Sequence, residues 1–94
     1  MISEYLPTGA ENAVTAKQLC NLLNMNHREL TKAITAERRA GQPICAVVGG
    51  FVKGYFLAAN KREMELYYRS LSHRLKEIRA TATACKKSIK ELPE

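Results

Sequence analysis

The sequence contains no aspartate and no tryptophan, and its two histidines are His27 and His73. Neither histidine has a partner at the spacing of a metal site or a catalytic triad. The sequence also lacks a paired-carboxylate site, a nucleophile with an adjacent base, and a glycine-rich loop of the kind that holds phosphate. We therefore expect no enzymatic activity, no cofactor, no metal and no small-molecule substrate.

Cysteine is scarce, and Cys20, Cys45 and Cys85 are widely spaced in apolar surroundings. This pattern supports neither a disulfide framework nor a zinc site, and we expect all three to be reduced packing residues. The N-terminus has no basic leader, and no stretch approaches the ~18 apolar residues of a membrane span. These absences predict a cytoplasmic protein without a membrane partner.

Positive charge is in excess. The chain of 94 residues has a net charge of +6, which suits an anionic partner. Residues 1–60 contain six Lys or Arg against four Glu, a net +2, whereas residues 61–94 contain nine against five, a net +4. Most of the excess therefore lies near the C-terminus, and the isoelectric point alone does not identify a nucleic-acid-binding module. A chain of this length can build one modest core.

Two short helices are predicted by their capping residues. Thr15 with Gln18, and Asn26 with Glu29, fit the capping box, in which two side chains satisfy backbone N–H groups at a helix start. Leucines recur at helical spacing after the first cap, and Gly41 is a natural terminator for the second helix. We expect the first helix to end around Asn24 and the second just before Gly41.

A hairpin and a long helix are predicted to follow. Ile44–Val48 and Tyr55–Leu57 are rich in β-forming residues and flank glycines, which is typical of a hairpin. Asn60 then caps a final helix that runs to about Leu92, and Glu63 repeats the capping-box spacing. At 1.5 Å per residue this helix is roughly 48 Å long, too long to be covered by the residues before it.

The N-terminal residues are less regular. Residues 1–6 are expected to form a short helix that stops before Pro7, and residues 8–14 a polar connection. Glu37 falls near the buried stripe of the second short helix. We expect its carboxylate to reach the rim or to pair with a cation such as Lys17, because burial without a partner would be costly.

One face of the second short helix carries hydrogen-bond donors. Leu30, Ala33 and Ile34 share one sector of a helical wheel. The opposite side carries Arg28, Thr31, Lys32, Thr35 and Arg39. Arginine and lysine can donate to guanine or phosphate, and threonine offers a hydroxyl and a methyl group, which suits a DNA major groove. An ordinary solvated face is the alternative interpretation.

The order of these elements resembles the winged helix-turn-helix of the biotin-repressor N-terminal type, over residues 15–57. Leu23-Asn24-Met25-Asn26 resembles the turn before its recognition helix, with asparagine in place of serine as the cap. Lys53-Gly54-Tyr55-Phe56-Leu57 resembles the end of its wing. The recognition positions that the resemblance implies are His27, Arg28, Thr31, Lys32 and Thr35, with a wing contact near Lys53. The resemblance includes no catalytic domain, so no enzymatic function is carried over.

In the final helix, apolar residues recur at every seventh position in two interleaved series. These eight residues, the heptad stripe, are Tyr68, Leu71, Leu75, Ile78, Ala82, Cys85, Ile89 and Leu92. A pattern sustained over about four heptads predicts helix pairing. We expect the segment from Met64 to Leu71 to pack on the preceding residues, and the stripe beyond Leu75 to bind the same helix of a second copy.

The sequence leaves the orientation of this homodimer open. In a parallel pair Arg74 would face Arg79 of the partner subunit, and the small Ala82 and Cys85 would weaken the middle of the seam. An antiparallel pair, or two subunits embracing each other's bodies, is the alternative.

Together these features predict a mainly α-helical chain with a small β-hairpin wing. Residues 1–58 would form a winged helix-turn-helix domain, and residues 59–94 a long amphipathic dimerisation helix. The expected function is sequence-specific binding of double-stranded DNA by a small dimeric transcriptional regulator of phage or mobile-element type, with Arg39 and Lys53 neutralising phosphate. One alternative is a protein-interaction or assembly module, favoured by an apolar wing tip. Another is a weakly specific architectural or replication-accessory DNA binder.

Overall fold

The computed structural model describes residues 1–47 and 54–94 of the chain. In order, the elements are η1 (Ile2–Tyr5), η2 (Ala10–Asn12), β1 (Val14–Thr15), α1 (Ala16–Leu23), α2 (His27–Arg39), β2 (Ile44–Ala46), β3 (Gly54–Leu57) and α3 (Lys61–Glu91). The expectation of a mainly helical chain with a small sheet and a long C-terminal helix is confirmed. Lys53 and the predicted wing tip lie outside the described residues.

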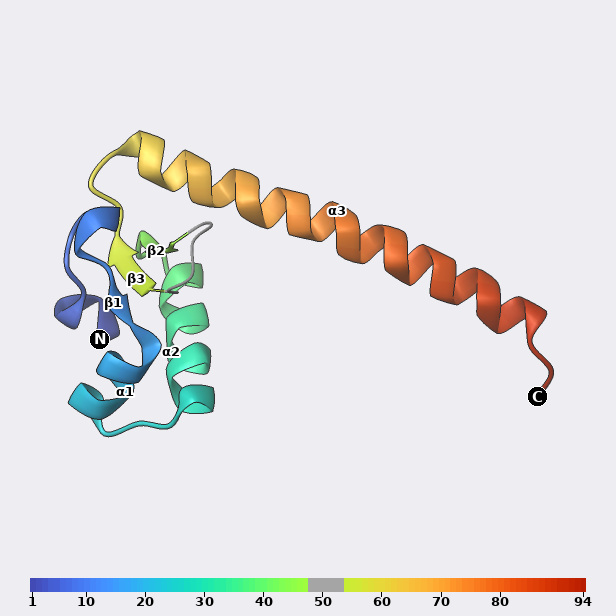
Figure 1. Cartoon of the computed structure of the whole chain (residues 1–94), viewed down its shortest axis with the longest axis horizontal. Coiled ribbons are helices and arrows are strands. Elements are labelled where there is room, and N and C mark those ends of the chain that lie inside the picture. The colour runs from blue at the N-terminus through green and yellow to red at the C-terminus, as the bar shows by residue number, and fades with distance from the viewer. Residues whose placement is uncertain (48–53) are drawn as a thin grey trace.

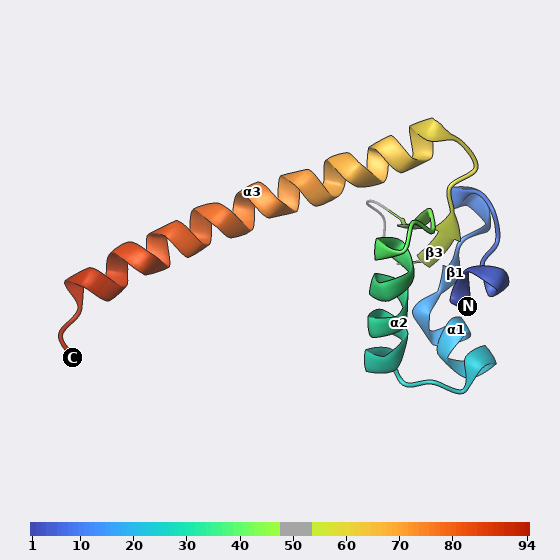
Figure 2. The same cartoon turned by 180° about the vertical axis from the view of Figure 1, so that it is seen from behind.

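The molecule has the outline of a body with a long arm (Figure 1). The body comprises the described residues up to 58, and the arm is α3, which runs far past it. The longest dimension is therefore 51 Å, against 31 Å and 28 Å in the other two directions. Figure 2 shows the same outline from behind, with α2 on the side of the body toward which the arm runs and α1 behind α2.

Side-chain caps begin the two short helices where the sequence predicts them. The N–H of Gln18 donates to Oγ1 of Thr15 (3.1 Å), and the N–H of Thr15 donates to Oε1 of Gln18 (2.8 Å). Asn26 and Glu29 form the same reciprocal pair, at 2.8 and 3.2 Å. Past the end of α2, Gly41 has a φ of +103°, a left-handed conformation that favours glycine. Local sequence features thus mark the starts of both helices and the end of α2.

The start of α3 departs from the predicted capping box. Oδ1 of Asn60 accepts the N–H of Glu63 at 3.0 Å, as expected. The Glu63 carboxylate, however, does not return to Asn60, and its oxygens instead accept the N–H groups of Ala59 (2.8 Å) and Ala10 (3.0 Å). Ala10 lies 53 positions earlier in the sequence. The carboxylate thus ties the start of α3 to the N-terminal segment, a contact that a local capping pattern cannot predict.

The sheet contains a strand that the sequence analysis missed. The predicted hairpin is present as β2 and β3, but β3 lies in the centre and also pairs antiparallel with β1. The expectation of a plain polar connection over residues 8–14 is therefore wrong, since this segment forms η2 and begins β1. Gly54 opposes Thr15, and a Cβ on Gly54 would lie 3.0 Å from Cβ of Ala13. The two strands can approach this closely because residue 54 has no side chain.

Two apolar clusters stabilise the body. The first lies between η1, α1, α2 and the sheet, and its buried members are Ile2, Leu6, Leu19, Leu30, Ile34 and Ile44. The second consists of Cys45, Phe56 and Tyr67. Because Tyr67 belongs to α3, this second cluster joins the arm to the sheet.

Glu37 is buried in α2, and neither of its predicted arrangements is correct. Its carboxylate accepts the backbone N–H of Ile2 at 2.7 Å and of Ser3 at 2.9 Å, instead of reaching the rim or pairing with Lys17. These N–H groups open η1 and have no partner within that short helix. Burial raises the pKa of the Glu37 carboxyl, but the hydrogen bonds from Ser3 and Ile2 together lower it by more than burial raises it. The pKa therefore lies below its ordinary value of 4.5.

The packing of α3 on the body is shorter than expected. Tyr67 is buried and Met64 half-buried against the second cluster. Tyr68 and Leu71, which were expected to pack there too, are 66% and 41% exposed. The arm leaves the body within about two turns of its start, because Tyr67, which is not in the heptad stripe, is the side chain that enters the core.

We expect Glu37→Gln to lower the free energy of unfolding by about 1–3 kcal/mol at neutral pH. The amide replaces one acceptor oxygen with a donor, so one buried backbone N–H loses its partner. Because the folded-state pKa is lowered, the carboxylate stabilises the fold above its ordinary pKa of 4.5, and this is lost as the pH falls through the folded value. The variant should therefore lose part of the acid sensitivity of folding.

Urea unfolding, measured at neutral pH and at successively lower pH, tests both effects. Glu77→Gln is the matched control, because Glu77 is exposed on α3. Equal stabilities and equal pH dependence for the two variants would show that the Glu37 carboxylate does not stabilise η1.

Candidate nucleic-acid interface

A three-residue turn sets the direction of α2 relative to α1. Asn24 ends α1 with a φ of +54°, the one positive φ of a non-glycine residue in the described chain. The N–H groups of Asn24 and Met25 both donate to the carbonyl of Cys20. The Met25 side chain packs against the first apolar cluster, and Asn26 caps α2. The turn is therefore held from both helices and from the core, and one side of α2 remains outside.

The outer side of α2 brings together the residues predicted to contact DNA, except Lys53, which lies outside the described residues. This α2 face consists of His27, Arg28, Thr31, Lys32, Thr35 and Arg39, of which Thr35 is half-buried and the others exposed. Within residues 1–47 and 54–94, the ion pair found joins the N-terminal ammonium to Glu4, and none involves a cation of this face. The charges of Arg28, Lys32 and Arg39 are therefore free to attract an anionic partner.

Hydrogen bonds within α2 already occupy two groups of this face that could otherwise bind an external partner. The hydroxyl of Thr31 donates to the carbonyl of His27 at 3.0 Å, which leaves its lone pairs and methyl group for an external partner. At the start of the helix, the Glu29 carboxylate already occupies the N–H of Asn26. A negative group is thus present at the positive end of the helix dipole. Attraction of an anion to this face depends on the side-chain cations rather than on the helix end.

Arg38, next to this face, was missed by the sequence analysis. Its Nε donates to the carbonyl of Ile44 at 2.8 Å. Its guanidinium carbon lies 4.8 Å from the ring centre of Tyr67 and 5.9 Å from that of Tyr55, within reach of a cation–π interaction. One side chain therefore connects α2 to β2, β3 and α3. Only its position on the half-buried side of the helical wheel could have distinguished it from Arg39.

Cys45 lies below this junction and is fully buried. Its thiol donates to Sδ of Met64 at 3.9 Å. Burial raises the pKa of the Cys45 thiol, more than the nearby Arg38 lowers it. The thiol therefore stays protonated at neutral pH and behaves as a packing group, since the thiolate is the reactive form.

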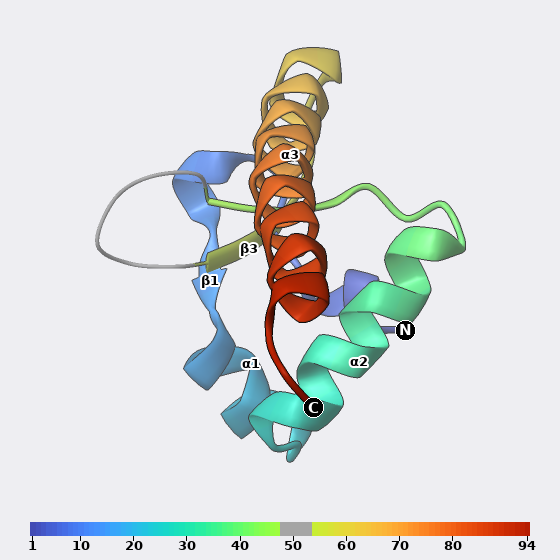
Figure 3. The ribbon, with the colours of Figure 1, turned by 90° about the vertical axis from the view of Figure 1, so that its right-hand side faces the viewer.

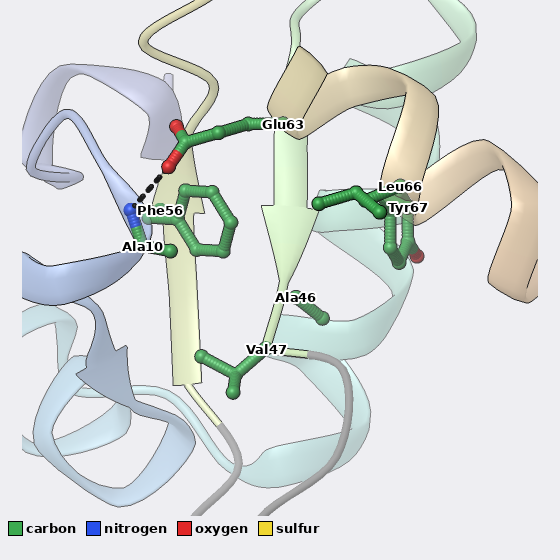
Figure 4. A pocket seen from close by; sticks show the side chains of 7 residues that line it. All are labelled: Ala10, Ala46, Val47, Phe56, Glu63, Leu66 and Tyr67. Carbon is green, nitrogen blue, oxygen red and sulfur yellow. Dashed lines mark hydrogen bonds between the residues drawn. The ribbon is translucent and has the colours of Figure 1, made fainter.

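A small apolar pocket lies between η2, the sheet and the first turns of α3 (Figure 4). It encloses about 170 Å³ and is lined by Ala10, Ala46, Val47, Phe56, Glu63, Leu66 and Tyr67. The Glu63 carboxylate is its one acidic group, and hydrogen bonds from Ala59 and Ala10 lower the pKa of this carboxyl. A carboxylate held ionised by two N–H donors is unsuited to proton transfer at neutral pH. The pocket could accommodate an apolar side chain.

The heptad stripe is largely uncovered. Tyr68, Leu75, Ile78, Ile89 and Leu92 are between 55% and 74% exposed. α2 lies on the side of the body toward which α3 runs, so the two helices stand at an angle to each other (Figures 1 and 2). The space between α2 (His27–Arg39) and the part of α3 beyond Leu71 is called the inner angle. Figure 3, which looks along α3 from its free end, shows α2 beneath it. An exposed apolar helix face of this length is unusual on a monomer.

Within residues 1–47 and 54–94, no three His, Cys or Glu side chains are grouped so that they could hold a metal ion. None of the helices in this part of the chain combines the length and the apolar character needed to cross a membrane. Comparisons of the chain with protein-family models, with curated proteins and with solved structures find no match.

We expect Arg38→Lys to lower the free energy of unfolding by about 1–3 kcal/mol. Lysine keeps the charge but lacks the planar group that donates to Ile44 while it lies over Tyr67. Arg39→Lys is the matched control, because Arg39 is exposed, and it should change stability by less than about 0.5 kcal/mol. Urea unfolding of the full chain measures both values. A loss no larger than that of the control would exclude Arg38 as a stabilising junction.

Proposed function

We propose that the chain is a double-stranded DNA-binding protein of the winged helix-turn-helix class that acts as a dimer. The observation that supports this most strongly is the α2 face, where Arg28, Lys32 and Arg39 are exposed and make no ion pair within the described residues. A helix-turn-helix places the face of its second helix in the major groove, with the first helix behind it.

The connections around α2 also favour this proposal. The helices α1 and α2 are joined by a three-residue turn, the usual length in a helix-turn-helix. The hairpin of β2 and β3 follows directly, and β1 completes its sheet. The link between β2 and β3, which includes Lys53, would be the wing.

Each residue of the α2 face has a chemical role in the proposal. Arg28 and Lys32, one helical turn apart, would donate to base edges or to flanking phosphates. Thr31 would present its methyl group and lone pairs to a base, and Arg39 would neutralise phosphate. Three cations make a small electrostatic footprint, so one copy would bind weakly. Pairing of the heptad stripe between two copies would double this footprint, as a small transcriptional regulator requires.

Replacing Arg28 and Lys32 together by alanine should weaken binding of a mixed-sequence duplex by at least about tenfold. The slope of log affinity against log salt should become shallower by roughly 2, because two phosphate-neutralising charges are lost. Fluorescence anisotropy with a labelled duplex at several salt concentrations measures both quantities. A duplex enriched from a random pool would show in addition whether the loss depends on sequence.

The charge-matched control is Arg69→Ala with Lys76→Ala, at exposed α3 positions outside the heptad stripe. If both double variants lose affinity equally, binding depends on total charge, and the weakly specific architectural role is favoured. If the wild-type chain binds no duplex at all, the protein-interaction alternative, supported by the exposed stripe and the apolar pocket, replaces the proposal.

Ile78→Glu should convert the proposed dimer to a monomer, because pairing would place two carboxylates in an apolar seam. Ile78 is 66% exposed in a single chain, so the body should keep its fold, as circular dichroism can verify. Sedimentation equilibrium at tens of micromolar measures the association, and Lys76→Glu, which also introduces glutamate but off the stripe, should remain dimeric. A monomeric wild-type chain would refute the dimer.

A further inference from the structure

We propose that α3 pairs with α3 of a second copy in an antiparallel arrangement centred on Ala80, with the partner helix lying in the inner angle. This inference deepens the proposed function, because it takes the dimer as given and assigns its geometry. A twofold dimer requires one surface that fits a copy of itself, and the sizes of the stripe residues provide the first test.

Antiparallel pairing about Ala80 places large residues opposite small ones in the middle of the stripe. The facing positions are those whose numbers are equally far from 80, so Ile78 faces Ala82 of the partner and Leu75 faces Cys85 of the partner. Each of these layers contains one large and one small side chain. Layers of similar total volume fill the space between two helices without voids.

The outer layers of the same arrangement are uniformly large. Leu71 faces Ile89 of the partner, and Tyr68 faces Leu92 of the partner. These four side chains are between 41% and 74% exposed in one chain. The antiparallel register therefore covers the whole stripe, and it does so with residues that the body leaves uncovered.

A parallel pair distributes the same residues less favourably. It would place Ala82 against Ala82 and Cys85 against Cys85, so two consecutive layers would be underfilled, which costs stability through lost packing. It would also bring Arg74 beside Arg79 of the partner twice, whereas the antiparallel pair has a single approach of the two Arg79 side chains at its centre. Like charges that face each other destabilise a helix pair.

The body selects this antiparallel register over the neighbouring one. A shift of one heptad toward the body would also pair large with small residues, Leu71 with Ala82 of the partner and Tyr68 with Cys85 of the partner. It would, however, place Ile89 of the partner opposite Met64. Met64 and Tyr67 already pack on the sheet, so the partner helix would have to enter the space that the body occupies. In the register centred on Ala80, the first layer is Tyr68, just beyond this contact.

The position of the stripe places the partner helix in the inner angle. Met64 and Tyr67 contact the body, and Leu71 and Leu75 follow at helical spacing on the same side of α3. The partner helix would therefore lie between the arm and the side of the body that carries α2. Its C-terminal end would come near Tyr68, just beyond the contact of α3 with the body. The two bodies would sit at opposite ends of the pair.

Disulfide formation distinguishes the two orientations. In the antiparallel pair the two native Cys85 residues are offset along the axis by roughly 15 Å, beyond the ~7 Å between Cα atoms that a disulfide permits. In the parallel pair they would face each other. Leu75→Cys would bring the new thiol opposite Cys85 of the partner in the antiparallel pair alone.

The experiment oxidises the full chain with copper–phenanthroline and identifies linked peptides by mass spectrometry. We expect the wild type to form no link between two Cys85 residues, and Leu75→Cys to increase the linked dimer on the order of tenfold. Leu75→Cys combined with Cys85→Ala is the control and should not link. Leu71→Cys with Ile89→Cys, in a Cys85→Ala background, repeats the test in an outer layer and should link.

Sedimentation of each variant before oxidation distinguishes a failure of the antiparallel register from a failure of the dimer. A chain that is dimeric but links Cys85 to Cys85 in the wild type is parallel, which overturns this inference and leaves the proposed dimer intact. A dimer in which neither introduced pair links also overturns the antiparallel register. A monomeric wild-type chain would refute both the antiparallel register and the dimer of the proposed function. Duplex binding, measured separately, would then test whether a single copy binds DNA.

Discussion

The contacts of Arg38 connect the body to the one buried side chain of the long arm within the described residues. Its backbone belongs to α2, its Nε binds the Ile44 carbonyl of β2, and its guanidinium lies over Tyr67 of α3. A planar guanidinium can do this because it donates within its plane and stacks on rings above it. Tyr67 is the buried residue of α3, so the direction of the whole helix depends on a contact made within its first two turns.

The Arg38 junction fixes the α2 face and the heptad stripe relative to each other. Arg38 lies on the same helix as the three exposed cations of the α2 face. Its contact with Tyr67 therefore holds α3 at a set orientation to that face. The helices that carry the two surfaces, α2 and α3, border the inner angle (Figure 1). The surfaces differ in chemistry, since the α2 face is cationic and the stripe apolar. A partner helix on the stripe and a nucleic acid on the α2 face would therefore be neighbours, and the space that each leaves would constrain the other.

The features that the sequence predicted are local, and those that it did not are long-range. Capping by Thr15 and Asn26 depends on residues three positions away, so their spacing predicts the helix starts. The roles of Glu37 and Glu63 depend on N–H groups 35 and 53 positions away, and no spacing rule contains them. β1 is two residues long and exists through its pairing with β3. The α2 face was identifiable by periodicity, whereas Arg38 required knowledge of what packs beside it.

The low charge of the body makes the arm important for the proposed function. Residues 1–60 carry a net charge of +2, and each neutralised phosphate contributes to affinity through counterion release. Three cations on one α2 face would give modest affinity and little discrimination. Joining two bodies makes the second contact intramolecular, which raises affinity without any new residue at the interface with DNA. A small body with a long arm that exposes an apolar stripe therefore suits a DNA-binding protein that acts as a dimer, and the geometry of the arm would determine the distance between the two bodies.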